Sequence, residues 1–448
     1  MFQFTPFYAF NALFKMSYPS IYRWDTADIK LYITKAILIY KMYLTTRVKI
    51  AEGGEEREAL REAGNICTKI WNKANYYCRE QWEQTGKIPS YYELQRVFKD
   101  DFWCRKLHSH TAQAVLHKLA ESYQSWYKLK KTDPKAHPPG FRKKNSISTI
   151  AFTNFAVRVE DHRLRLTLTK GKHIWLDYQV QPGVEITQGN IVRVEITNGY
   201  SNIVYRVEEP EPKKKGQVMA IDLGIINTAT TVKEDGEAKI YSGKGVLSIQ
   251  RYFNKEIAKL QSIVMNQSGG KKKWSRQLSE LSRKRRRQIK HALHALTRSI
   301  VEDCVKSNVK EVVIGDLRNI RKGKRWNKKS SQKLHAWGFK QFTELLRYKL
   351  ALEGIRLVTV NEKSTSKMCS RCGYVDRYNR KKRGWFKCRK CGYEENADIN
   401  AAINILKKYL HQTGRPVEGS SGVVNAPRVI RWDGNIPSEP DARQFIGG

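Results

Sequence analysis

The sequence predicts a mixed α/β protein with a helical part, a β-rich part and an α/β domain that carries a cysteine-containing insert. Three observations lead to this prediction. Apolar residues recur at helical spacing early in the chain, they alternate at strand spacing in the middle, and short strands alternate with long helices afterwards. A chain of 448 residues is long enough for two or three domains with cores of their own.

The first half of the chain predicts an N-terminal extension, a helical domain and a group of strands. Residues 1–41 precede the first strand-like alternation, "MYLTTRVKI". Residues 57–140 are helical, most clearly in "SHTAQAVLHKLAESYQSWYKLKK", where apolar residues repeat at three and four. Three prolines in "KTDPKAHPPGFRKK" end this helix, and residues 141–210 then alternate as strands. The charged, proline-containing segment "EEPEPKKKG" predicts a domain boundary.

The second half alternates short strands with helices. Three short strands, "QVMAIDLG", "TATTVKE" and "EAKIYSG", precede two long basic helices at about 249–262 and 272–308. After them come the strand "EVVIGDL", the helix "AWGFKQFTELLRYKLALEG", the strand "IRLVTVNE", a cysteine module and the helix "ADINAAINILKKYL". This order is that of a ribonuclease-H-like domain, although other α/β folds share it. Residues 413–448 are rich in Gly, Pro and Ser, which predicts a flexible tail.

The charge of the chain indicates a nucleic-acid partner. The formal net charge is +40, from 83 Lys and Arg against 43 Asp and Glu. Like charges at this density repel one another unless a polyanion neutralises them. Ribosomal proteins are as basic, but they are usually shorter and poorer in Trp than this chain, which has 11. These aromatic residues suit base stacking as well as packing, and the sequence does not divide them between the two roles.

The sequence predicts no transmembrane helix and no membrane partner. Its start, "MFQFTPFYAFNALF", is apolar but too short to span a bilayer, and it lacks the basic lead-in of a secretory signal. Four scattered cysteines, Cys67, Cys78, Cys104 and Cys304, do not suggest a secreted disulfide framework and are expected to be reduced. We therefore expect a cytoplasmic, nucleoid-associated protein.

The other four cysteines have the spacing of a structural zinc site. Cys369 and Cys372 form one C-x-x-C pair, Cys388 and Cys391 form a second, and fifteen residues separate the pairs. A glycine follows each pair and allows the turn that points backbone amides at sulfur. Two redox pairs, or chance, are the alternatives. The intervening loop "DRYNRKKRGWFK" is basic and aromatic, which suits a nucleic-acid contact.

Two aspartates are candidate site residues. Asp222 ends the strand "VMAIDLG", and Asp398 opens the final helix in "ENADINAAINI". Taken alone, Asp222 can equally be a turn residue and Asp398 a helix N-cap. Their combination with a zinc module favours a role in chemistry.

These motifs together resemble the TnpB family, the transposon-encoded RNA-guided nucleases long described as OrfB-type transposases with a zinc ribbon and related to the miniature type V CRISPR effectors. The resemblance rests on "IDLGIINTAT", "VVIGDL", "TSKMCSRCG", "CRKCG" and "NADINAAINIL". It is close over residues 217–411, looser over 42–210, and does not cover the two ends. It implies a wedge domain at 42–56 and 141–210, a recognition domain at 57–140, a RuvC nuclease domain at 216–366 and 395–412, and a zinc ribbon that binds target nucleic acid at 367–394.

The resemblance implies an RNA-guided DNA endonuclease that cuts next to a short flanking motif, guided by a transposon-derived or CRISPR RNA. In this family a RuvC-type site holds two Mg²⁺ ions with three acidic residues, and one zinc ion is structural. Asp222 matches the first acid and Asp398 the last. The second acid is usually the Glu of an "E-D-L" triplet, and Gly315 stands at that position here.

Two residues are candidates for the missing acid. Asp316 follows Gly315, but successive side chains of a strand point to opposite faces, so Asp316 is expected to face away from the site. Glu362 closes the neighbouring strand in "VNEKSTSKMC" and can reach across a glycine. Some TnpB branches resemble this exchange, with "GD" in one motif and Glu before "TS" in the next. We therefore predict Glu362 as the third acid, with a solvated loop residue as the alternative.

Three basic stretches, "KKKWSRQ", "RKRRRQIK" and "RKGKRWNKK", are expected to contact duplex and guide RNA. A single charge run is usually a solvated face, but three of them surround one presumed site. The candidate contacts are Lys272, Lys273, Arg285, Arg286, Arg287, Arg321, Lys324, Arg325 and Arg383.

The expected partners are a guide RNA and a target DNA, in a monomeric ribonucleoprotein with a dimer as the alternative. Other functions remain open at this point. The chain can be an RNA-guided DNA-binding repressor that has lost cleavage, for which Gly315 is the main argument. It can also be a transposition accessory protein that binds DNA, or a transposase that joins strands itself.

Overall fold

The computed structural model divides into two compact units, Met1–Glu208 and Glu209–Gly448, which are described separately. The division falls inside "EEPEPKKKG", the segment expected to be a boundary. The structure describes residues 41–50, 54–161, 163–169, 171–180, 184–271, 273–316, 338–380, 384–415, 428–432 and 437–438. The predicted N-terminal extension therefore lies outside the described residues, except for Lys41.

The described residues of the first unit form four α-helices. They are α2 (Glu55–Thr85), α3 (Tyr91–Val97), α4 (Phe102–Arg105) and α5 (Ser109–Lys130). Local sequence explains where the short ones begin. Ser90 and Glu93 form a capping box at the start of α3, and the Asp101 carboxylate caps α4. The long helices α2 and α5 pack together, and the Tyr123 hydroxyl donates to Asn75 Oδ1 at 2.6 Å in their core.

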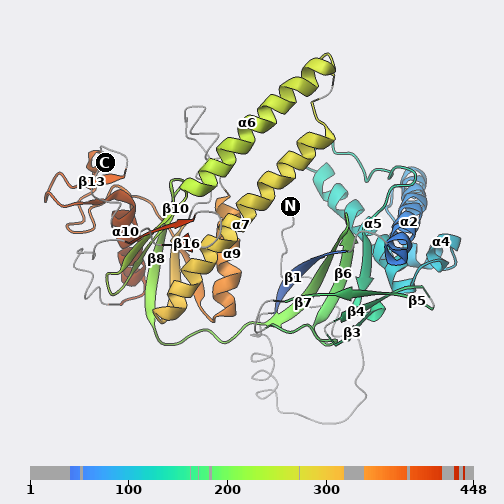
Figure 1. Ribbon diagram of the computed structural model, residues 1–448, viewed down its shortest axis with the longest axis horizontal. Helices are drawn as coiled ribbons and strands as arrows, with labels where there is room; N and C mark the ends of the chain where they lie inside the picture. Colours follow the sequence, from blue (N-terminus) through green and yellow to red (C-terminus); the bar gives the residue numbers. More distant parts are fainter. Residues whose placement is uncertain are drawn as a thin grey trace, which may run out of the picture. The chain divides into compact units, whose positions relative to one another are not determined.

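Strands complete the first unit (Figure 1). A four-stranded antiparallel sheet has the order β1-β7-β6-β2, and a three-stranded sheet has the order β3-β4-β5. The bounds are β1 Lys41–Lys49, β2 Ile150–Thr153, β3 Val157–Glu160, β4 Arg163–Thr169, β5 Lys172–Asp177, β6 Ile191–Thr197 and β7 Tyr200–Glu208. β1 therefore pairs with a strand that lies 151 to 167 residues later in the sequence, from Lys49 with Tyr200 to Lys41 with Glu208. The helices belong to the chain segment between these two paired strands.

A seven-stranded sheet forms the centre of the second unit, with the order β12-β11-β8-β9-β10-β15-β16. β8, β9 and β10 form an antiparallel meander, whereas β11 is parallel to β8 and β12 is parallel to β11. The bounds are β8 Gln217–Leu223, β9 Asn227–Lys233, β10 Ala238–Ser242, β11 Val309–Gly315, β12 Arg356–Val360, β15 Arg428–Trp432 and β16 Pro437–Ser438. The carboxyl ends of β8, β11 and β12 thus meet at one edge of the sheet.

Helices cover both faces of this sheet. Apolar residues of α7 and α9 pack on one face, and those of α10 pack on the other. Helices α6 and α7 lie side by side as a long hairpin (Figure 1). The bounds are α6 Lys244–Gln267, α7 Arg276–Lys306, α9 Phe339–Leu352 and α10 Ala397–Gln412. A small two-stranded sheet, β13 Trp385–Lys387 with β14 Glu394–Asn396, belongs to the cysteine module.

The prediction of a flexible tail over residues 413–448 is wrong for part of this segment. Residues 428–432 form β15, which pairs in parallel with β10 and extends the central sheet. Burial of two apolar side chains accounts for this strand. Ile430 is buried in the core beside α7 and α9, and Val429 packs against the core on the other face of the sheet. The edge of β10 supplies the hydrogen-bonding partners of β15, and the composition of the tail gives no sign of this pairing.

Within the described residues, no helix is long and apolar enough to cross a membrane.

Candidate active site and metal centre

Asp222 lies at the carboxyl end of β8, near the middle of the sheet. Side chains alternate between the faces of a strand, so Asp222 shares a face with Val218 and Ala220. Those two residues pack in the core formed with α10, whereas Met219 and Ile221 pack in the core formed with α7 and α9. The register of β8 therefore directs Asp222 to the face that α10 covers.

Asp398 reaches the same region from the first turn of α10. The N-cap of this helix is Asn396, whose side chain accepts the backbone amides of Asp398 and Ile399. Asp398 is therefore not the N-cap, and its carboxylate is used elsewhere. Its Oδ2 accepts from Asn227 Nδ2 at 2.8 Å, and its Oδ1 accepts from Arg380 Nη2 at 3.0 Å.

Glu362 occupies the space beside Gly315. Gly315 ends β11, where it pairs with Val360 of β12, and Glu362 follows two residues after Val360. A Cβ at position 315 would contact the Glu362 carboxylate and would lie 3.1 Å from Glu362 Cβ. The turn that carries Glu362 is held by Thr365, whose amide and hydroxyl donate to the Glu362 carbonyl at 3.1 and 2.9 Å. A glycine at 315 is thus the condition for this position of Glu362.

Asp316 belongs to the other face of the sheet. Its amide donates to the Val360 carbonyl at 2.8 Å, so the pairing of β11 with β12 continues to this residue. Val312 and Ile314, which alternate with Asp316, pack in the core beside α7 and α9, whereas Val313 packs in the core beside α10. The strand register separates Asp316 from the face shared by Asp222 and position 315.

The carboxylates at this edge of the sheet influence one another electrostatically. Burial raises the pKa of Asp222 to about 8, and the charges of Asp398 and Glu362 add to this effect. The Arg380 guanidinium lowers the same pKa, but it does not cancel the other two causes. Burial and two neighbouring carboxylates therefore disfavour the charged form of Asp222, and a bound cation would offset this cost.

The four cysteines of the module converge on one point. Their sulfur atoms all lie within 4.8 Å of one another, and in the described part of the chain they are the one group of His, Cys, Asp or Glu side chains that meets this test. The short distances cross between the two pairs, with Cys369 Sγ 3.7 Å from Cys391 Sγ and Cys372 Sγ 3.5 Å from Cys388 Sγ. This arrangement fits a single four-thiolate metal site and not two separate redox pairs.

Backbone amides tune one of these thiols toward the charged form. The Tyr393 amide lowers the pKa of Cys391 to about 7, as expected of a sulfur placed in a knuckle turn. Burial instead raises the pKa of Cys369 to about 12. A bound cation would offset the cost of charging this buried sulfur.

Two buried asparagines fasten the cysteine module to α10. Asn400 Oδ1 accepts from the Ser370 amide at 2.9 Å, and Asn400 Nδ2 donates to the Met368 carbonyl at 2.9 Å. Asn404 Nδ2 donates to the carbonyls of Thr365 and Met368 at 2.8 and 2.7 Å. The helix that carries Asp398 therefore also carries the anchors of the metal module.

The predicted nucleic-acid contacts are only partly described. Lys273 is exposed at the start of the α7 region, and Arg286 and Arg287 are exposed on α7. Arg285 is half-buried and donates to Asn254 Oδ1 on α6 at 2.8 Å, so it also joins the two helices. Five candidates lie outside the described residues, namely Lys272, Arg321, Lys324, Arg325 and Arg383.

Sequence reasoning missed two residues of the carboxylate site. Asn227 is part of "IDLGIINTAT", so the motif contained it without indicating its role. Arg380 lies in the basic loop of the cysteine module, where one more arginine among several gave no signal. Only the folded chain brings both residues to Asp398.

Comparison with known proteins shows which protein families the chain resembles. The model of a probable transposase family, OrfB_IS605, matches residues 202–321, and the model of the Cas12f1-like TNB domain matches residues 339–405. TnpB-like protein ORF457 of Acidianus two-tailed virus is 26% identical over 418 residues, which cover 83% of this chain and 88% of the relative. The chain is thus similar to TnpB proteins over most of its length.

Other TnpB-like relatives are similar over long or short parts of the chain. InsQ of Escherichia coli (strain K12), whose name describes an RNA-guided DNA endonuclease, is 22% identical over 396 residues, with 83% of this chain and 96% of InsQ covered. The CRISPR-associated endodeoxyribonuclease Cas12f1 of Sulfoacidibacillus thermotolerans is 38% identical over 113 residues, which are 25% of each chain. The resemblance of this sequence to TnpB proteins is thus confirmed.

Proposed function

We propose that this TnpB-like chain is an RNA-guided DNA endonuclease whose catalytic acids are Asp222, Glu362 and Asp398. One observation carries the proposal. The Glu362 carboxylate occupies the space that a side chain at Gly315 would take, on the face of the sheet that Asp222 also addresses. In this branch of the family, the second acid is supplied by the strand beside the usual one.

The topology of the second unit supports assignment as a ribonuclease-H-like RuvC domain. Its first three strands are an antiparallel meander, and the fourth and fifth are added in parallel on the other side of the first strand. The strand ends that carry Asp222 and Glu362 lie on either side of the end of β11. Gly315 places no side chain at the end of β11, between these two strand ends.

The donor chemistry of the two centres fits two kinds of metal. Carboxylate oxygens are the ligands that Mg²⁺ prefers. Burial, and then the charges of Asp398 and Glu362, raise the pKa of Asp222, and a divalent ion would offset both effects. Mg²⁺ held by Asp222, Glu362 and Asp398 would activate water and stabilise charge on a phosphodiester. The four convergent cysteines fit one structural Zn²⁺.

The protein's own residues hold these carboxylates in place. Asn227 fixes one oxygen of Asp398, and Arg380 holds the other while no cation competes for it. Thr365 fixes the turn that presents Glu362. These partners limit the rotation of the acids, so the site is arranged before a substrate arrives.

A guide RNA and a target DNA are the proposed partners. The net charge of +40 supports phosphate binding, and the names of InsQ and Cas12f1 point to guided cleavage of DNA. In this proposal the guide supplies sequence recognition by base pairing, while the protein reads backbone shape and a short flanking motif. The recognition domain (57–140) then falls in the first unit, as does the wedge domain (42–56 and 141–210) apart from its last two residues.

The test is cleavage of DNA by purified ribonucleoprotein whose co-purified RNA has been sequenced. We expect cleavage of matching DNA with Mg²⁺ and none with Ca²⁺ or after Mg²⁺ is omitted, with guided binding retained. The affinity for RNA should fall steeply between about 50 and 200 mM salt, because many counterions are released on binding. No cleavage of matching DNA under any divalent ion would overturn the proposal.

An RNA-guided DNA-binding repressor is the second candidate, and Gly315 is the observation that favours it. The usual acid is absent at this position. Guided DNA binding without cleavage in the same experiment would select this function.

A further inference from the structure

We propose that a pocket between α3 and α5, in the first unit, binds one unstacked nucleotide of the nucleic acid that the chain carries. The proposal deepens the proposed function and rests on it. The pocket has a volume of about 680 Å³, which is within the usual range for small-ligand sites. It is separate in the fold from the carboxylates and the cysteines, which belong to the second unit.

The floor of the pocket is apolar and preformed. Phe98, Leu107, Ala112 and Leu116 line it, and each is buried in the core of the first unit. A planar, weakly hydrated group gains the most binding free energy from contact with such an apolar surface, and a nucleobase is such a group. Tyr92 lies at the rim with 75% of its surface exposed. Its ring packs at a tilt against Tyr91, with 5.3 Å between the centroids, and the exposed remainder is available for stacking.

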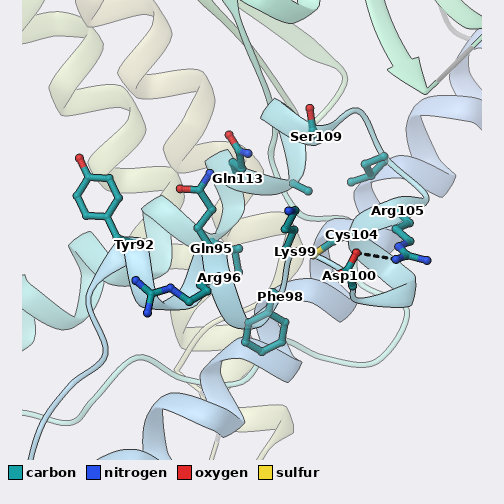
Figure 2. A pocket seen from close by; sticks show the side chains of 13 residues that line it. Tyr92, Gln95, Arg96, Phe98, Lys99, Asp100, Cys104, Arg105, Ser109 and Gln113 are labelled. Atoms are coloured by element: carbon teal, nitrogen blue, oxygen red, sulfur yellow. Dashed lines mark hydrogen bonds and ion pairs between the residues drawn. The ribbon is translucent and has the colours of Figure 1, made fainter. Parts of the chain in front are cut away.

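Two carboxamides provide hydrogen bonds at the rim. Gln95 reaches the pocket from α3 and Gln113 from α5 (Figure 2). The interaction drawn among the lining residues is the one between Asp100 and Arg105, and it involves neither glutamine (Figure 2). A carboxamide offers a donor and an acceptor side by side, which is the pattern that reads the edge of a base.

The charge around the pocket suits a phosphate. Arg96, Lys99 and Arg105 line it together with one acid, Asp100, which pairs with Arg105 at 2.6 Å. Arg96 and Lys99 are exposed, and two cations thus remain beside the apolar floor. A nucleotide matches both parts of this surface, with its base on the apolar floor and its phosphate at the basic rim. A purely apolar ligand would match only the floor, and a small anion only the rim.

The experiment combines abasic replacements in the nucleic acid with pocket variants of the protein, in the full ribonucleoprotein. Single nucleotides of the guide RNA, and then of each target DNA strand, are replaced by abasic residues, and equilibrium affinity is measured for each. The same scans are repeated with Gln113→Leu and Gln95→Leu. Gln124→Leu is the matched control, because Gln124 is exposed on the same helix α5 and does not line the pocket.

We expect one position at which the abasic replacement weakens binding by about tenfold in the wild type, the effect of losing one stacked or hydrogen-bonded base. In both pocket variants the same abasic replacement should cause almost no further loss of affinity, since the base no longer has its binding site in these proteins. The arm in which this position is found identifies RNA or DNA as the source. Gln124→Leu should leave the scan unchanged.

Two results would overturn the inference. In the first, the losses of affinity caused by abasic replacement and by the pocket variants are additive at every position of the guide RNA and of both target DNA strands. In the second, Gln124→Leu changes the scan as the pocket variants do. Circular dichroism separates either result from misfolding of the variants. The proposed function has its own readout, because intact guide and cleavage of matching DNA would still be observed if only the pocket assignment were wrong.

Discussion

The carboxylate of Glu362 lies against the backbone of Gly315, in the space that any other residue at 315 would fill with its Cβ. Gly315 is paired in parallel with Val360, and Glu362 follows from the same strand end. The resemblance to TnpB proteins places an acid at position 315, and the carboxylate of Glu362 from the neighbouring strand lies in the space of that side chain. The absence of a side chain at 315 and the presence of Glu362 are two parts of one arrangement.

Gly315→Ala should displace the Glu362 carboxylate. The new Cβ would lie 3.1 Å from Glu362 Cβ and would overlap the carboxylate, which would have to shift. We expect a folded protein that cleaves DNA about 10- to 100-fold more slowly, the range found when a partner of a metal ligand is disturbed. Gly338→Ala is the control, because a Cβ there meets neighbours at an ordinary 3.5 Å. Cleavage by Gly315→Ala at the wild-type rate would contradict the steric argument.

Arg380→Gln should strengthen binding of divalent ions. Arg380 is a cation bonded to Asp398 at 3.0 Å, so an ion at Asp398 must compete with it or share the carboxylate. The thermal unfolding midpoint, titrated with Mg²⁺, should rise at lower ion concentration in this variant than in the wild type. Arg377→Gln tests the specificity, since Arg377 is exposed and contacts Tyr378. If both variants follow the wild-type titration, Arg380 does not oppose the ion.

The stability of the Mg²⁺-free protein should depend on the protonation of Asp222. Its pKa is about 8 in the folded chain against an ordinary 3.8, so the folded protein retains a proton that the unfolded chain releases. Stability is therefore lost as the pH rises from about 4 to about 8. Asp222→Asn removes this loss, and its unfolding midpoint should fall less between pH 5 and pH 8 than that of the wild type. Parallel pH profiles of the two proteins would show that Asp222 is not the group responsible.

Removal of one cysteine ligand should release zinc and weaken cleavage. We expect one zinc per chain by metal analysis in a reducing preparation, and none in Cys372→Ser. Because Asn400 and Asn404 join the module to α10, loss of zinc should disturb Asp398 and Arg380 while guide RNA stays mostly bound. Cys304→Ala should keep its zinc, since Cys304 is buried between α7 and the sheet. A folded wild-type protein without zinc would refute the assignment.

Much of the site could be predicted because its signals are local. The cysteine spacing indicated a four-thiolate cluster, and the strand before Asp222 indicated a carboxylate at a sheet edge. The opposite faces of Gly315 and Asp316 follow from the alternation of a strand, which needs no tertiary information. The approach of Glu362 to Gly315 depended on the parallel pairing of β11 and β12, which the resemblance to a known family suggested.

The features that were missed depend on contacts between distant segments. Asn227 and Arg380 meet Asp398 across 171 and 18 positions of the sequence, and no local pattern marks either residue. Strand β15 was missed because "RVIRW" is a short apolar run within a tail of loop-forming composition. Its strand conformation depends on the open edge of β10, which only the assembled sheet provides.

Cleavage by Glu362→Ala and Asp316→Ala, compared in one assay, tests the relocation of the acid most directly. Both proteins are loaded with the same guide, and guided DNA binding is measured in parallel to establish that each ribonucleoprotein assembles. The account predicts that Glu362→Ala binds matching DNA but does not cut it, because a ligand of the catalytic ions is lost. Asp316→Ala should cut at a rate near that of the wild type, because its side chain belongs to the opposite face of the sheet. A Glu362→Ala protein that cuts normally, beside an inactive Asp316→Ala protein, would contradict the account.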